Sequence, residues 1–337
     1  MRATGRRRKS AVARESAARW SEGFLFAPRS GVAWFPHLEE AFDAFGAFEW
    51  VTFAYLGWLI VVIAAFHRNI AGAPLYLGIH AGIAVGILWL ARAASLPRKS
   101  WLRVVRHWYP LPLYLFFFEA LGGLVHAIFP QWMDQWLIDF DVWFTGGVQP
   151  AVRFARIASP ALNDFMQFAY MTYFVFLFLL PLILYLRGES RPFWTTTVAT
   201  AIANYSVYVI AVLAPTESPY HAFAWLRAQP LEGSYCTAVI EFIERFGRVH
   251  AAAFPSAHVA GSMVAMLASY RYRRWFFWTC LPFFASMCVA TVYGRYHYVA
   301  DVFAGLAVGY LGFAAGTWLM KKTGAMPAIA NEARGNN

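Results

Sequence analysis

Eight apolar segments, separated by short polar stretches, limit what this chain can fold into. A helix needs about 20 apolar residues to cross the hydrocarbon core of a bilayer, and these segments are close to that length. Hydrophobic residues make up 60% of the 337 residues and charged residues only 14%, whereas soluble domains are about 25% charged. We therefore expect an all-α, polytopic membrane protein with about eight transmembrane helices. The predicted spans are residues 50–66, 74–94, 108–129, 165–186, 194–214, 256–270, 275–292 and 298–320.

The net charge of +10 follows membrane topology and does not indicate a nucleic-acid partner. With the N-terminus in the cytoplasm, most of the 28 Lys and Arg residues fall on the cytoplasmic side. They lie in the first 49 residues, between residues 92 and 106, and in the turns at 187–191, 271–274 and 321–322. This is the bias of the positive-inside rule. We expect an integral protein of the cell or inner membrane with both termini in the cytoplasm.

The segments outside the spans are expected to lie on the membrane or in water. Residues 1–49 are predicted to be a cytoplasmic tail with a possible interfacial helix. Residues 130–163 alternate tryptophan with aspartate and are predicted to lie along the bilayer surface. The three cysteines are too few and too scattered for a disulfide framework or a zinc site.

Two short motifs place histidine at the edges of apolar segments. Residues 254–258 read Phe-Pro-Ser-Ala-His, and residues 296–301 read Tyr-His-Tyr-Val-Ala-Asp. His258 begins the sixth span, and His297, 39 positions later, begins the eighth. Ionisable groups are costly at such places and are usually functional. In the predicted topology both beginnings face outward, so we expect the two motifs to meet at the extracytoplasmic face.

The residue types in these motifs are those that phosphoryl transfer needs. His297 and Asp301 are four residues apart and would share one face of a helix, where the carboxylate orients the imidazole. A nucleophilic or basic histidine requires that support. His258 could protonate a leaving oxygen. The free backbone N–H groups at the start of its helix could hold an anion, and nearby arginines could neutralise phosphate oxygens. The predicted catalytic residues are His258, His297 and Asp301, and the predicted substrate-binding residues are Ser256, Arg295 and Arg248.

The two motifs resemble the second and third signatures of the type-2 phosphatidic acid phosphatase superfamily. Residues 139–141, 144–150 and 215–219 look more narrowly like its inositol phosphorylceramide synthase-like branch. This resemblance implies that His297 attacks phosphorus to form a phosphohistidine, that Asp301 supports it, and that His258 protonates the departing group. It implies no metal and no other cofactor.

The resemblance covers roughly residues 105–320, which would form a six-helix catalytic domain. Residues 50–104 would then be two additional helices, and residues 321–337 a cytoplasmic tail. The family's first signature, a lysine followed seven residues later by Arg-Pro, is absent, since Arg191-Pro192 lies on the predicted cytoplasmic side. Ala290-Thr291 stands where the family usually has Ser-Arg, so Arg295 is the expected substitute.

These features predict a lipid phosphatase or phosphotransferase. Its expected partners are the bilayer, a lipid phosphate or phospholipid substrate and, if it is a transferase, an alcohol or lipid acceptor. Hydrolysis and transfer share their first half-reaction and stay open here. One alternative is a non-catalytic lipid-phosphate binder or transporter. Another is a metal-dependent membrane hydrolase, for which His250 is the candidate third ligand. Glu119, in the third span, could be a packing residue or line a headgroup cavity.

Overall fold

The computed structural model describes residues 42, 44–95, 100–247 and 252–324, and this part of the chain is helical with no strand. The predicted all-α class is confirmed. The predicted tail helix before residue 42, Arg248 and His250 lie outside the described residues. The α-helices are α3 (Ala47–Ala65), α4 (Ala73–Ser95), α5 (Ser100–Trp108), α6 (Pro110–Leu124), α7 (Gln135–Phe144), α8 (Pro150–Ala155), α9 (Pro160–Leu186), α10 (Ser190–Leu213), α11 (Pro219–Ala222), α12 (Ala224–Arg227), α13 (Tyr235–Gly247), α14 (Ala257–Tyr272), α15 (Arg274–Tyr293) and α16 (Val299–Thr323).

Six of the described helices are long and apolar enough to span a bilayer: α3, α4, α9, α10, α15 and α16. The other two predicted spans form shorter helices, α6 with 15 residues and α14 with 16. The predicted third span is cut short because Pro110, which has no N–H to donate, begins α6 directly after the basic helix α5.

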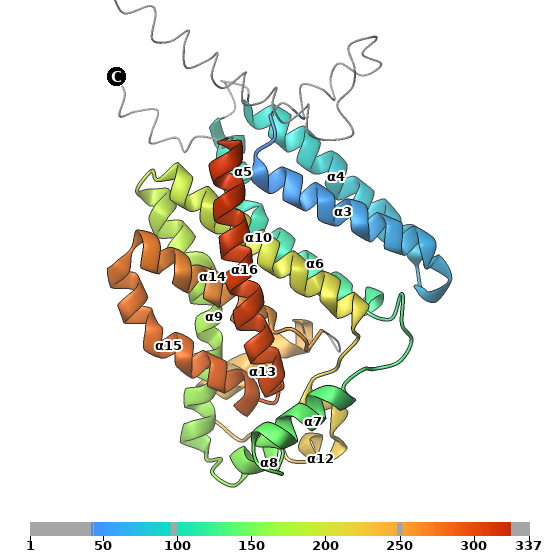
Figure 1. The fold of residues 1–337 in the computed structure, drawn as a ribbon, viewed down its shortest axis with the longest axis vertical. Helices are drawn as coiled ribbons and strands as arrows, with labels where there is room; N and C mark the ends of the chain where they lie inside the picture. Colours follow the sequence, from blue (N-terminus) through green and yellow to red (C-terminus); the bar gives the residue numbers. More distant parts are fainter. Residues whose placement is uncertain (1–41, 43, 96–99, 248–251, 325–337) are drawn as a thin grey trace, which may run out of the picture.

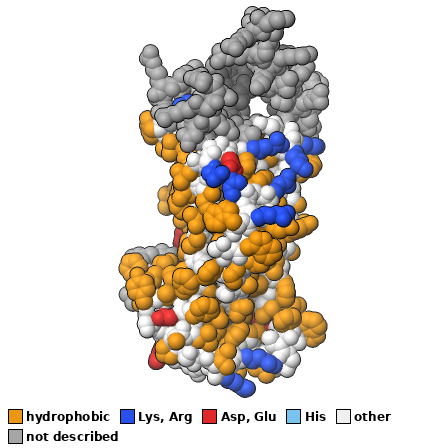
Figure 2. All heavy atoms as spheres, turned by 90° about the vertical axis from the view of Figure 1, so that its left-hand side faces the viewer, with side chains coloured by type: hydrophobic (Ala, Val, Ile, Leu, Met, Phe, Trp, Pro, Cys, Tyr) orange, Lys and Arg blue, Asp and Glu red, His pale blue; other side chains and the backbone are white. Residues whose placement is uncertain are grey.

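Large apolar side chains cover the outside of the bundle. Val61, Leu75 and Val85 are 65%, 67% and 64% exposed, and Figure 2 shows hydrophobic side chains spread over the middle of one face. Contiguous apolar surface of this extent is unusual for a soluble monomer and fits contact with lipid. Glu119 lies on the exposed side of α6, so it is not a buried packing residue.

Helix α10 lies inside the bundle and contacts α16, α14, α9, α6 and α3 (Figure 1). Its inward-facing residues are mostly small or hydroxyl-bearing, and threonines bond back to carbonyls of their own helix, as Thr197 Oγ1 does to Phe193 O. Helices α3 and α4 lie at one side (Figure 1). The buried pair of Glu49 and Arg106, at 2.8 Å, ties the start of α3 to α5.

Glycines let α16 approach its two neighbours closely. A Cβ placed on Gly305 or Gly309 would come within 2.8 Å of Ser256 O or 2.5 Å of Ala260 O, both in the chain entering or forming α14. On the next turns, Gly312 and Gly316 face Ala203 and Ala199 of α10 in the same way. Small residues at such spacing are typical of helix contacts in membranes. They place the start of α16 directly beside the start of α14.

One end of the bundle carries short helices. Helices α7, α8 and α12 lie together at the end where α16 begins (Figure 1). The predicted surface-lying segment corresponds to α7 and α8, whose Trp136 and Trp143 are exposed. Helix α13 was not predicted; its apolar residues Tyr235 and Phe242 are also exposed. At the other end, Lys and Arg side chains gather (Figure 2).

Candidate active site

The second histidine motif forms the turn between α15 and α16. The backbone N–H groups of Tyr296 and His297 both donate to Thr291 O, at 3.0 and 3.1 Å, which folds the turn back onto the end of α15. Arg295 adopts a left-handed conformation with φ 68°, which costs a non-glycine residue of the order of 1 kcal/mol. The turn leaves His297 only 5% exposed at the end of the bundle.

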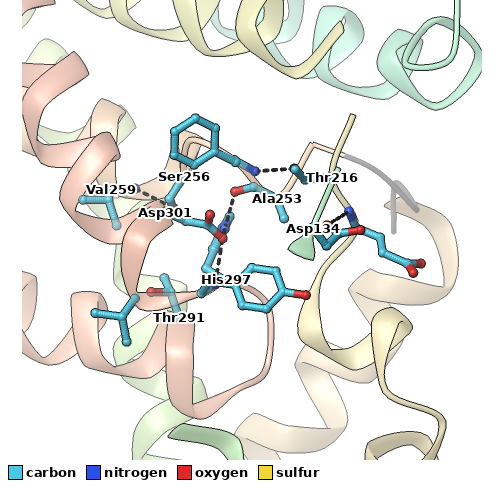
Figure 3. Close-up of polar contacts among 12 residues, drawn as sticks. Asp134, Thr216, Ala253, Ser256, Val259, Thr291, His297 and Asp301 are labelled. Atoms are coloured by element: carbon cyan, nitrogen blue, oxygen red, sulfur yellow. Dashed lines mark hydrogen bonds and ion pairs between the residues drawn. The ribbon is translucent and has the colours of Figure 1, made fainter. Parts of the chain in front are cut away.

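The imidazole of His297 is held through one of its two nitrogens. Nδ1 donates to the carbonyl oxygen of Ala253 at 2.8 Å and lies 3.4 Å from Asp301 Oδ2 (Figure 3). Both of these partners are acceptors, so Nδ1 carries the proton and the lone pair is on Nε2. The structure thus brings together the predicted pair, although His297 lies in the turn before α16 and not on a helix face shared with Asp301. The two contacts fix the tautomer in which Nε2 can act as a nucleophile.

Asp301 links the histidine to the helix that follows it. Its side chain is fully buried, and Oδ2 also accepts from the backbone N–H of Tyr298 at 2.7 Å, which caps the start of α16. Its backbone oxygen accepts from Ser256 N at 3.1 Å. One residue therefore orients His297 and also joins the two motifs.

His258 lies in the first turn of α14 and faces His297. The centroids of the two imidazole rings are 5.7 Å apart, so the two histidines predicted from motifs 39 positions apart are neighbours. Ser256 is fully buried and its Oγ accepts from Val259 N at 3.3 Å, which makes it the cap of α14. The side chain of Ser256 thus stabilises the helix that carries His258, and its predicted role in substrate binding stays a prediction.

Two tyrosines of α9 that the motifs do not predict contact His258. Tyr170 Oη lies 2.8 Å from His258 Nε2 in a hydrogen bond, and the ring of Tyr170 stacks on Tyr296 at 4.4 Å. Tyr173 packs edge-on against His258 at 4.6 Å. A signal was present: Asn163, Gln167 and Tyr170 repeat at helical spacing along a span that is otherwise apolar. Gln167 Oε1 accepts from Tyr296 Oη at 3.0 Å.

Of the two arginines predicted to bind substrate, Arg295 and Arg248, the structure describes only Arg295. Arg295 is buried, and its Nη1 donates to Leu226 O at 2.7 Å and to Gln229 O at 2.6 Å, which holds the turn to the end of α12. Burial lowers the pKa of Arg295 from its ordinary value. These bonds describe an arginine that anchors the turn; its predicted contact with phosphate stays a prediction. Arg248 lies outside the described residues.

Two buried aspartates hold the site from the side of α7. Asp141 Oδ1 accepts from Val299 N at 2.9 Å, and Asp134 Oδ1 accepts from Glu217 N at 2.8 Å. Burial raises the pKa of each to about 7, and the hydrogen bonds from backbone N–H groups oppose that rise. From the sequence these acids are expected to be part of a surface segment, because charge pattern alone does not reveal which acids accept backbone hydrogen bonds.

The loop before α14 is fixed by Thr216 (Figure 3). Its backbone oxygen accepts from Ala253 N at 3.3 Å, and its Oγ1 accepts from Phe254 N at 2.9 Å. Ala252, just before this point, has φ 66°. The carbonyl of Ala253 is therefore held in place on both sides before it reaches His297.

If the two histidines bind one ligand together, His297 can contact it through one ring nitrogen only. His297 Nδ1 is held by Ala253 O and Asp301, so Nε2 is the atom left to bind or attack. A metal would need further ligands, and His250, the candidate third one, lies outside the described residues.

The fold and the site define a polytopic helical membrane protein with a carboxylate-supported histidine facing a second histidine. A family model described as the PAP2 superfamily matches residues 135–315, which is more than half of the 337 residues. The chain belongs to the PAP2 superfamily. Members of this superfamily are typically phosphatases, which supports a phosphatase-type membrane enzyme. No curated protein and no solved structure shows a significant match to the chain.

Proposed function

We propose that this protein cleaves a phosphate ester or anhydride of a lipid through a covalent phosphohistidine on His297. The observation that carries the proposal is the fixed tautomer of His297: Nδ1–H points to Ala253 O and Asp301, which leaves the lone pair on Nε2, and the ring of His258 lies 5.7 Å away, centroid to centroid. The site lies at one end of a bundle that has six helices long and apolar enough to cross a bilayer, so a lipid could reach it by diffusion in the membrane.

In the first step, Nε2 of His297 attacks phosphorus, and the bond between phosphorus and the leaving oxygen breaks. The leaving oxygen takes a proton from His258, whose ring centroid lies 5.7 Å from that of His297. The imidazole of His297 becomes cationic as it forms the N–P bond, and Asp301, with Oδ2 3.4 Å from Nδ1, stabilises that charge.

In the second step, an oxygen nucleophile attacks the phosphohistidine, gives its proton to His258, and releases His297. Water as nucleophile gives hydrolysis and free phosphate. An alcohol as nucleophile gives transfer of the phosphate or of a head-group phosphate. This outcome is favoured by the likeness of residues 139–141, 144–150 and 215–219 to the inositol phosphorylceramide synthase-like branch. Hydrolysis needs no second binding site and is the simpler of the two.

We place the reaction at the extracytoplasmic face, with both termini in the cytoplasm. The support is the charge distribution: Lys321 and Lys322 close the last turn of α16, at the end opposite to His297, and Lys and Arg residues gather there (Figure 2). Cysteine labelling from either side of right-side-out vesicles, at position 67 and at position 322, tests this orientation.

The deciding experiment is product analysis with purified protein in lipid nanodiscs. The donors are phosphatidate, an isoprenyl pyrophosphate and phosphatidylinositol, each with and without ceramide or diacylglycerol. The variants are His297→Ala, His258→Ala and, as a matched control, His67→Asn, because His67 is exposed at the end of α3. Free phosphate that disappears in His297→Ala and survives a chelator supports a histidine phosphatase. A new phospholipid that needs an acceptor supports transfer.

Two outcomes would overturn the proposal in different directions. Turnover that a chelator abolishes and added zinc or manganese restores would favour the metal-dependent hydrolase. Lipid-phosphate binding without turnover on any donor, unchanged in His297→Ala, would favour a binder or transporter. Acid-labile phosphate covalently bound to wild-type protein and absent from His297→Ala would support the phosphohistidine directly.

A further inference from the structure

A cavity lies at the end of the bundle opposite to the histidines. Its volume is about 370 Å³, and it forms where the first turns of α10 meet the last turns of α14 and α16. Twenty residues of α16 separate Asp301 from Lys321, which lines the cavity, and this corresponds to about 30 Å along the helix. The two sites are therefore one hydrocarbon thickness apart.

Each of the three helices contributes one cation to the cavity: Arg191 from α10, Arg271 from α14 and Lys321 from α16. Within the described part of the chain, none of the three forms an ion pair. Glu189, the acid nearest to Arg191 in the sequence, forms ion pairs with Arg187 and Arg273. Three like charges around one hollow repel each other, and an anion in the hollow would remove that cost.

A polar atom without a partner also lines the cavity. Thr317 Oγ1 is buried and forms no hydrogen bond with the described residues. The neighbouring Thr195 hydroxyl is used, since it donates to Arg191 O at 2.8 Å. The start of α10, a 24-residue helix, adds the positive end of its dipole to the same place. An unused hydroxyl and a helix N-terminus beside three cations are suited to a phosphate group.

We propose that this cavity binds the phosphate of an anionic phospholipid from the leaflet at the basic end of the bundle. Trp275, in the first turn of α15, and Trp318, near the end of α16, are 60% and 55% exposed at this end. Exposed tryptophans mark the depth of the headgroups, where acyl chains can extend along the bundle. Basic pockets between transmembrane helices on this side of a membrane suit such headgroups. The inference is independent of the chemistry proposed for His297.

The test is lipid retention by the full-length protein in detergent, measured by native mass spectrometry. Phosphatidylglycerol is compared with phosphatidylcholine in wild type and in two triple variants that remove equal charge. The first variant, Arg191→Gln/Arg271→Gln/Lys321→Gln, neutralises the cavity. The second, Arg187→Gln/Arg274→Gln/Lys322→Gln, neutralises three cations of the same end that do not line it.

We expect the cavity variant to bind phosphatidylglycerol about tenfold or more weakly, while the control variant changes by less than about threefold. Unchanged phosphatidylcholine retention and an unchanged melting temperature show that each variant is folded. Equal losses in the two variants would mean that only the overall charge of this end matters, and would overturn the proposal.

Two further experiments test whether the ligand is a lipid or free phosphate, and whether the Thr317 hydroxyl contributes to binding. Inorganic phosphate at millimolar concentration should not displace phosphatidylglycerol; full displacement would show a site for free phosphate and refute the lipid assignment. Thr317→Val keeps the shape and the charge but removes Oγ1. We expect it to weaken phosphatidylglycerol retention several-fold, and wild-type retention would contradict the cavity as the binding place.

Discussion

The side chain of Asp141, in α7, accepts a hydrogen bond from the backbone N–H of Val299, the first residue of α16, at 2.9 Å. The two residues are 158 positions apart in the chain. The bond satisfies an N–H group that has no partner inside the helix, and it places a carboxylate at the positive end of the helix dipole. His297 lies two residues before this point, so the position of α7 and the position of the histidine are coupled.

Replacing Asp141 should therefore disturb both stability and activity. Asp141→Ala removes the acceptor, and we expect a loss of about 1 kcal/mol in the free energy of unfolding together with a lower kcat. Asp141→Asn keeps an acceptor oxygen and should retain most of both. The matched control is Asp139→Ala, since Asp139 is exposed on the same helix and, among the described residues, its carboxylate bonds to Gln135 alone. Melting temperatures in detergent, with kcat and KM, make the comparison; equal effects at 139 and 141 would contradict the capping role.

The two buried aspartates predict how stability depends on pH. The pKa of Asp134 and of Asp141 is raised from 3.8 to about 7, chiefly by burial. A raised carboxyl pKa means that the folded state binds the proton more tightly than the unfolded state. Stability therefore falls as the pH rises from about 4 to about 7 and is constant above that. The upper bound of the loss is about 4 kcal/mol per carboxyl.

The measurement is the melting temperature of wild type and of Asp134→Asn/Asp141→Asn between pH 4.5 and 8.5. We expect wild type to melt at higher temperature at the acid end and the double variant to show a flatter profile, because asparagine does not titrate. A wild-type profile that rises with pH through this window, or a double variant with the same slope, would refute the assignment.

The helical class could be predicted from the length of the apolar segments, and the pairing of the two histidine motifs from the predicted topology. The spacing of His297 and Asp301 correctly predicts that they meet, but His297 lies in the turn before α16 and not on a shared helix face. The count of full-length spans depends on breaks such as Pro110, which a hydropathy window averages over. The acceptor of the His297 proton, Ala253 O, could not be predicted, since a backbone oxygen carries no sequence signal.

The predicted roles of Ser256 and Arg295 show a second limit. Both residues belong to the neighbourhood of the site, as expected, yet the bonds they form are a helix cap and a tie to two carbonyl oxygens. Residue type indicates which bonds are possible, and the packing of α12 against the turn decides which are made. Tyr170 illustrates the reverse case, in which a residue that looks like membrane packing hydrogen-bonds His258.

Because α16 packs closely against α14, replacing a glycine at that contact should destabilise the protein more than replacing a glycine elsewhere. A Cβ on Gly309 would lie 2.5 Å from Ala260 O and 2.7 Å from Met263 Cβ, so one helix must move. We expect Gly309→Ala to cost about 1–3 kcal/mol, and Gly309→Val more. Gly82→Ala in α4 is the control, because nothing lies within 4 Å of its added Cβ, and it should be neutral or slightly stabilising. Equal melting temperatures for the two alanine variants would mean that α16 and α14 do not pack this closely.

Replacing Thr216 should affect catalysis only indirectly, by moving the backbone carbonyl that orients His297. Thr216 is fully buried, and its Oγ1 accepts from Phe254 N at 2.9 Å, next to the carbonyl that holds His297. Thr216→Val leaves that N–H without its acceptor, at a cost of about 1–3 kcal/mol, and lets Ala253 O shift away from Nδ1. The imidazole would then be free to change tautomer or to rotate. We expect kcat to fall about tenfold with little change in KM, because substrate contacts are unaffected.

Rescue by the conservative variant separates this positioning role from a loss of folding. Thr216→Ser keeps the acceptor oxygen and should recover most of kcat. Thr197→Val is the matched control, because its buried hydroxyl bonds only to a carbonyl of its own helix. A uniform loss of kcat in all three variants, in step with their melting temperatures, would mean that the hydroxyl supports folding only. A loss of kcat in Thr216→Val at a temperature where that variant is still fully folded, with Thr216→Ser and Thr197→Val near wild type, would show that the loop before α14 sets the orientation of His297.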